Sequence, residues 1–228
     1  MSIKNYIWDF DGTLYDTYPH TLAAFCETAR RRGMEIDPDE AYRQMRITLW
    51  DAFRFYKVDD AFIEQFYGIE NDLSFRPHGA PFSQIPEMLR YIAAHGGKNF
   101  LYTHRDKVAL EYLQRDGLMN LFSGLVTREN GFPLKPAPDA LRWMLREYAL
   151  EPAECLMIGD RAIDVKAGEN AGIAGCLFDP GANTAEPDGS ADTAGLFSMI
   201  RRSLGKDGGC DTDEKNFYKN TENPQIVK

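Results

Sequence analysis

The sequence lacks a long apolar segment and has few cysteines. None of its apolar runs approaches the roughly 18 residues that a membrane-spanning helix requires, so no membrane span is expected. Its first residues, MSIKNYIWD, reach an acidic residue before the apolar segment of a signal peptide could develop, so no export is expected. The four cysteines form no CxxC pair, and two of them lie in apolar runs, which favours a protein of the reducing cytoplasm.

An excess of positive charge is also missing. The formal net charge is -9 at pH 7 and the pI is about 5.0. We expect no nucleic-acid partner, because binding to backbone phosphates requires a basic surface. Any anionic ligand must therefore be held by local hydrogen-bond donors or by a metal ion.

Short apolar runs alternate with helical patterns along most of the chain. The runs are rich in strand-forming residues and lie at 3–8, 100–102, 125–127, 155–158 and 176–178. From Pro81 onward, helical spacings of apolar residues separate them, for example at Ile85, Met88, Leu89 and Ile92. This alternation predicts a doubly wound, Rossmann-like α/β core with a parallel sheet covered on both faces.

The alternation stops between residues 15 and 77, where four helical patterns follow one another without a convincing strand. We therefore predict a helical-bundle cap at 15–77, inserted into a core made of 1–14 and 78–205. The insertion follows the first strand, beside the strand end where ligands bind in open α/β sheets. The polar stretch 206–228 is predicted to be a disordered tail.

The strongest chemical signal is the segment DFDGTL at 9–14, at the end of the first predicted strand. It places the carboxylates of Asp9 and Asp11 where both can face one crevice. A solvated acidic turn is the alternative, since Asp and Gly are common turn residues.

Other strand ends favour the chemical interpretation. Thr103 follows the second core strand, Asp160 follows the fourth, and Asp164 lies shortly after it. Lys135 precedes a predicted helix. The carboxyl ends of parallel strands meet at one edge of the sheet, so these groups are expected to gather there. Clustered carboxylates repel one another unless a cation joins them, and oxygen ligands suit Mg²⁺.

With these residues in this order, the chain resembles the haloacid dehalogenase-like hydrolase superfamily, in its phosphoglycolate phosphatase-like branch with a helical cap. The resemblance covers about the first two hundred residues. It is carried by four motifs: Asp9-Phe10-Asp11-Gly12-Thr13, then Thr103, then Lys135, then Gly159-Asp160-Arg161-Ala162-Ile163-Asp164.

The resemblance implies a phosphatase acting on a small phosphorylated metabolite. It makes Asp9 the nucleophile that becomes an aspartyl phosphate and Asp11 the general acid and base. It places Thr103 and Lys135 on the phosphoryl oxygens. The implied Mg²⁺ ligands are Asp9, the backbone carbonyl of Asp11, Asp160 and, more loosely, Asp164. The sequence names neither the substrate nor the oligomeric state.

Three further residues are candidates with ordinary alternatives. His104 follows Thr103, so its backbone N–H could bind phosphate, but a loop histidine satisfied by backbone groups fits equally. Arg46 and Thr48 join two cap helices, in the region that approaches the substrate in this family. They are candidates for substrate specificity, and a solvated helix end is the alternative.

Two other functions use similar residues. A phosphomutase forms the same aspartyl phosphate but returns the phosphoryl group to a sugar. A receiver-type signalling module also combines an acidic cluster with a Thr and a Lys. In that module the phosphate acceptor stands on a later strand and no cap follows the first strand, which disfavours it here.

Overall fold

A computed structural model of the chain describes residues 2–72, 74–75, 78–179, 191–205 and 226–227. The chain divides into two units, one made of Met1–Leu14 and Phe82–Lys228 and the other of Tyr15–Pro81. The inserted unit thus extends past residue 77, the boundary expected from the sequence, to Pro81. The tail predicted at 206–228 lies outside the described residues, apart from residues 226 and 227, which form a strand.

The larger unit is built on one sheet with the strand order β5-β4-β1-β6-β7-β8. The first five strands of that order run parallel, and β8 pairs antiparallel with β7. The strands are β1 (Asn5–Trp8), β4 (Lys98–Tyr102), β5 (Phe122–Val126), β6 (Cys155–Gly159), β7 (Ala174–Leu177) and β8 (Ile226–Val227). This confirms the predicted α/β class and its parallel sheet.

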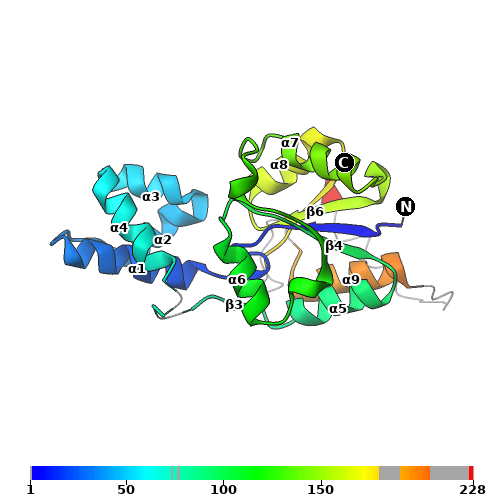
Figure 1. The fold of residues 1–228 in the computed structure, drawn as a ribbon, viewed down its shortest axis with the longest axis horizontal. Coiled ribbons are helices and arrows are strands. Elements are labelled where there is room, and N and C mark those ends of the chain that lie inside the picture. Colours follow the sequence, from blue (N-terminus) through cyan, green and yellow to red (C-terminus); the bar gives the residue numbers. More distant parts are fainter. Residues whose placement is uncertain (1, 73, 76–77, 180–190, 206–225, 228) are drawn as a thin grey trace, which may run out of the picture. The chain divides into compact units, whose positions relative to one another are not determined.

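Helices cover both faces of this sheet. They are α5 (Ile85–Ala94), α6 (Val108–Arg115), α7 (Asp139–Glu147), α8 (Ala162–Ala171) and α9 (Thr193–Leu204), with short 3-10 helices at Met119–Leu121, Arg128–Asn130 and Pro152–Glu154. Figure 1 shows α7 and α8 over one face and α5 and α9 over the other. The apolar stripe predicted from residue 85 onward is the buried face of α5, with Ile85, Met88, Leu89 and Ile92 all inaccessible to solvent.

Strand β1 positions the site because it lies at the centre of the sheet. Tyr6, Ile7 and Trp8 are fully buried, as expected of a central parallel strand covered on both faces. Trp8 pairs with Leu101 of β4 and with Ile158 of β6, so the carboxyl ends of the three strands lie side by side. The chain reverses its order across β1, with later strands on both sides, which is the switch point where such sheets bind ligands.

The inserted unit is a helical bundle, as predicted. Its helices are α1 (Tyr18–Arg31), α2 (Pro38–Ile47), α3 (Leu49–Phe55) and α4 (Asp60–Glu70). Phe25 of α1 is fully buried and its ring lies 5.1 to 6.2 Å from those of Phe53, Phe62 and Phe66. The side chains of Asp37, Thr48 and Asp59 cap the N-termini of α2, α3 and α4.

Two very short strands begin and end the inserted unit. They are β2 (Tyr15–Asp16) and β3 (Ala80–Pro81), which pair antiparallel. Across the described parts of both units, no helix combines the length and the apolar composition needed to cross a bilayer.

Candidate functional site

The turn after β1 separates its two carboxylates. The Asp9 N–H continues the ladder by donating to the carbonyl of Ile158 at 2.9 Å, and Asp9 is only 1% exposed. Gly12 then adopts a φ of +76°, which a side chain would disfavour, and the turn brings the Leu14 N–H to the Phe10 carbonyl at 3.0 Å. Asp9 is therefore held by the sheet, whereas Asp11 lies on the turn.

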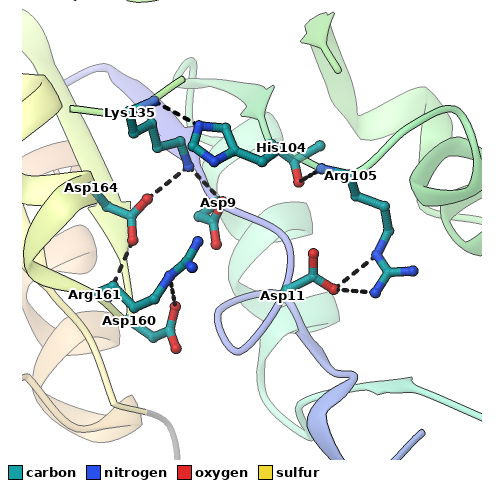
Figure 2. A network of polar contacts seen from close by, with 9 residues as sticks. Asp9, Asp11, His104, Arg105, Lys135, Asp160, Arg161 and Asp164 are labelled. Carbon is teal, nitrogen blue, oxygen red and sulfur yellow. Dashed lines mark hydrogen bonds and ion pairs between the residues drawn. The ribbon is translucent and has the colours of Figure 1, made fainter. Parts of the chain in front are cut away.

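Lys135 links this turn to helix α8. Its ammonium group donates to Asp9 Oδ1 at 2.5 Å and to Asp164 Oδ1 at 2.7 Å, and its side chain is fully buried (Figure 2). Burial lowers the pKa of Lys135, but attraction to Asp164 and Asp9 outweighs burial and raises the pKa above its usual value. Lys135 therefore stays charged and bridges the two carboxylates.

A glycine at the end of β6 makes room for Asp164. A Cβ at Gly159 would lie 2.3 Å from the Cβ and Cγ of Asp164, which is too close for any side chain. Asp164 stands in the first turn of α8, where its Oδ2 accepts the backbone N–H of Arg161 at 3.1 Å. The loop from β6 into α8 thus fixes Asp164 while carrying Asp160 at the strand end.

These residues form an acidic group suited to a cation. Asp9, Asp160 and Asp164 each offer an oxygen, and these oxygens lie within 4.8 Å of one another. Asp9 Oδ2 is buried and has no hydrogen-bond partner within the described residues. Burial raises the pKa of Asp9 to about 7, with Lys135 opposing the rise and Asp164 adding to it. A buried oxygen without a donor, among clustered carboxylates, fits a hard divalent cation such as Mg²⁺.

The carboxylate of Asp11 has a different partner. Arg105 contacts Asp11 Oδ1 with Nε at 2.9 Å and with Nη2 at 2.8 Å (Figure 2). The sequence interpretation missed Arg105. A signal was available, because Arg105 follows the end of β4 and Asp11 follows the end of β1, and the two strands were both expected in one parallel sheet.

Thr103 and His104 lie on the same turn after β4. The Thr103 hydroxyl accepts the Arg105 backbone N–H at 3.0 Å. His104 Nε2 accepts the backbone N–H of Lys135 at 2.7 Å. Burial, and after it the charge of Lys135, lowers the pKa of His104 to about 3, so the ring is neutral at physiological pH. The imidazole therefore holds the Lys135 loop, and its Nε2 is already engaged.

Arg46 and Thr48 belong to the inserted unit, where both make local contacts. The Thr48 hydroxyl accepts the Asp51 N–H at 3.0 Å and donates to Asp51 Oδ2 at 2.5 Å, so it caps α3. The Arg46 guanidinium lies 5.0 Å from the centre of the Tyr18 ring. The structure thus gives Thr48 a structural role and places Arg46 on an aromatic face.

The chain is similar to known hydrolases. A family model described as haloacid dehalogenase-like hydrolase matches residues 6–178. Pyrophosphatase PpaX of Oceanobacillus iheyensis is 23% identical over 177 residues, covering 76% of this chain and 82% of that protein. Phosphoglycolate phosphatase of Vibrio vulnificus is 25% identical over 205 residues, covering 82% and 88% of the two chains. The crystal structure of a hydrolase from Streptococcus pneumoniae TIGR4 is 29% identical, covers 88% of this chain and 99% of that one, and gives a TM-score of 0.62.

Proposed function

Because the chain belongs to the haloacid dehalogenase-like hydrolase family, we propose that it is a phosphatase that hydrolyses a small phosphate monoester through an aspartyl phosphate on Asp9. The observation that carries this proposal is the environment of Asp9. One carboxylate oxygen is held by Lys135 and the other has no hydrogen-bond partner within the described residues. Lys135 thereby orients the Asp9 carboxylate at the end of β1, where its oxygens can meet both a cation and the phosphorus of a substrate.

In the first step, an oxygen of Asp9 forms a bond to phosphorus as the bond to the leaving oxygen breaks. Asp11 gives its proton to that leaving oxygen, so the alcohol departs neutral. The Lys135 ammonium and the Thr103 hydroxyl are the donors proposed for the phosphoryl oxygens, where negative charge is concentrated.

In the second step, water attacks the phosphorus of the aspartyl phosphate. Asp11, now a carboxylate, takes a proton from this water, and the bond between phosphorus and Asp9 breaks. Inorganic phosphate leaves, and both carboxyl groups return to their starting forms. A phosphomutase would instead return the phosphoryl group to a sugar hydroxyl at this point.

Mg²⁺ is the cofactor proposed for the acidic group. Asp9, Asp160 and Asp164 would hold it, together with the backbone carbonyl of Asp11. When bound, the ion supplies positive charge that neutralises the phosphoryl group and favours the ionised form of the carboxylates.

The proposed substrate is a small phosphorylated metabolite. The relatives named above are a pyrophosphatase and a phosphoglycolate phosphatase, so pyrophosphate and phosphoglycolate belong in a first panel together with sugar phosphates, nucleotides and p-nitrophenyl phosphate. Free phosphate is the diagnostic product, because a mutase would yield an isomer of a sugar phosphate without releasing phosphate.

The test compares phosphate release by the wild type, Asp9→Asn and Asp39→Asn, an exposed aspartate used as the control. Asp9→Asn should lower kcat by at least about a thousandfold, because an amide is a poor nucleophile. Asp39→Asn should match the wild type. Chelation should abolish activity and added Mg²⁺ should restore it. Substantial turnover by Asp9→Asn would exclude the covalent mechanism, and full activity after exhaustive chelation would exclude the metal.

A further inference from the structure

The contact between Arg105 and Asp11 is a second charged pair beside Asp9. Both Nε and Nη2 of Arg105 contact the same oxygen, Asp11 Oδ1, at 2.9 and 2.8 Å. The Arg105 side chain is 10% exposed and that of Asp11 is 27% exposed. Water therefore screens this pair less than it screens an ordinary surface pair, and a guanidinium fixes the orientation of a carboxylate better than an ammonium does.

Arg105 is itself fixed at both sides of its backbone. Its N–H donates to the Thr103 hydroxyl at 3.0 Å, and its carbonyl accepts the Arg128 N–H at 2.9 Å. These contacts tie the turn after β4 to its own strand end and to the segment after β5. Asp11, by contrast, lies on the turn that contains Gly12, and Arg105 reaches it from the turn after β4.

We propose that Arg105 is the positioning residue of Asp11, holding its carboxylate in the orientation needed to activate water against the aspartyl phosphate. This inference rests on the proposed function. Asp11 must accept a proton from a water molecule aligned with phosphorus, and small misplacements of such a group lower rates strongly.

The proposal distinguishes the two steps of the reaction. p-Nitrophenolate is a good leaving group and needs little protonation, so forming the aspartyl phosphate depends weakly on Asp11 with this substrate. Hydrolysis of the aspartyl phosphate needs the base with every substrate. Loss of Arg105 should therefore slow the second step more than the first, and phosphorylated enzyme should accumulate.

Arg105→Met removes the charge and keeps a side chain of similar reach, while Arg105→Lys keeps the charge. With p-nitrophenyl phosphate and Mg²⁺, Arg105→Met should lower kcat about 10- to 100-fold without raising KM. It should release a burst of p-nitrophenol close to one per enzyme and contain hydroxylamine-sensitive phosphoprotein. Arg105→Lys should recover part of kcat. Arg90→Met, an exposed position on α5, should behave as the wild type.

A double-mutant cycle decides whether Arg105 acts through Asp11. In the Asp11→Asn background, Arg105→Met should change kcat less than about twofold, because the positioned carboxylate is already gone. If the effects of the two substitutions on kcat multiply in the double variant, or if KM rises with kcat unchanged, the positioning role is overturned. An equal loss in both steps without a burst would overturn it too. A wild type that releases no phosphate from any substrate would instead remove the proposed function, and this inference with it.

Discussion

The two units use charged residues in opposite ways. In the larger unit, Lys135 is fully buried and joins Asp9 and Asp164, which lie 126 and 29 residues away in the sequence. In the inserted unit, pairs such as Arg54 with Asp51 and Arg30 with Glu27 lie three residues apart on one helix, and both arginine side chains are 73% exposed. These charges gather at the candidate site in the first unit and pair along the surface of single helices in the second.

The interiors of the two units also differ in the residues that fill them. The inserted unit is held by an aromatic cluster around Phe25, with helix caps that use only neighbouring residues. The larger unit places buried polar groups at its strand ends. Such groups are expensive to bury without partners, so their retention is expected where they perform chemistry. We therefore expect the reaction in the larger unit, and the comparison predicts four different responses to substitution.

The largest effect is expected from Lys135→Met. Two buried carboxylates would lose their shared cation, which should lower the free energy of unfolding by about 3–5 kcal/mol in the presence of chelator. It should also abolish turnover of every phosphate substrate. Arg54→Met is the matched control from the inserted unit and should change stability by less than about 0.5 kcal/mol. Denaturant unfolding measures both, and equal losses would contradict the contrast between the units.

Phe25→Ala tests the interior of the inserted unit. Phe25 is fully buried, so its truncation should lower the free energy of unfolding by about 3–5 kcal/mol. Phe55→Ala is the control, since Phe55 is 52% exposed and should contribute less than about 0.5 kcal/mol. Calorimetry would record the melting transition of each variant. A similar shift of the melting temperature in both variants would mean that burial of the aromatic cluster does not dominate the stability of the inserted unit.

His104→Gln tests a neutral buried group in the larger unit. The folded pKa of about 3 lies below the usual 6.5, so the stability that His104 contributes is complete above pH 6.5 and is lost as the pH falls toward 3. Gln can keep an acceptor near Nε2 but does not titrate. Between pH 7.5 and pH 5.5 the wild type should therefore lose about 1.4 kcal/mol relative to the variant.

The comparison with the variant is needed because Asp9 acts in the opposite direction. Its folded pKa of about 7 lies above the usual 3.8, so its contribution is complete below 3.8 and is lost as the pH rises toward 7. That contribution is common to both proteins and cancels in their difference. A difference that stays constant with pH would show that His104 titrates normally.

Arg46→Ala is expected to have the smallest effect. It tests whether a charged residue of the inserted unit takes part in function, which would contradict the contrast between the units. It should lower kcat/KM for the best substrate of the panel about fivefold, the value of a partly exposed ion pair, and change p-nitrophenyl phosphate hydrolysis less than about twofold. Only the larger substrate offers a group beyond the phosphate. If both activities fall equally, or neither falls, Arg46 is a solvated helix end and not a specificity residue.

The longer helices and strands could be predicted from the sequence because their apolar patterns extend over enough residues to be recognised. The apolar run at 3–8 and the spacing from Ile85 to Ile92 became β1 and α5. Strands β2, β3 and β8 have only two residues each, so they carry no period and depend on pairing partners far away in the sequence. Helix α8 shows no stripe of large apolar residues, since its buried side includes small residues such as Ala167 and Gly168.

The sequence predicts the candidate site only where the ends of parallel strands indicate which residues gather. The rule that parallel strands end at one edge grouped Asp9, Lys135 and Asp164, and the structure brings these three into contact. The rule does not state which side chains pair. Arg105 meets Asp11 across two turns, and the Nε2 of His104 meets the backbone of Lys135, and both contacts depend on side-chain directions that no periodic pattern encodes.

The short ribbon that begins and ends the insertion makes the inserted unit exchangeable. The Phe82 N–H donates to the Leu14 carbonyl at 3.1 Å, and Tyr15–Asp16 pairs antiparallel with Ala80–Pro81. Two adjacent antiparallel segments are what a tight hairpin turn connects, so a two-residue turn such as Asn-Gly could replace the chain between them without removing a strand from the main sheet. Because the entropy of loop closure rises slowly with length, bundles of other sizes could be grafted at the same place. The strand order of the main sheet would be the same after such an exchange.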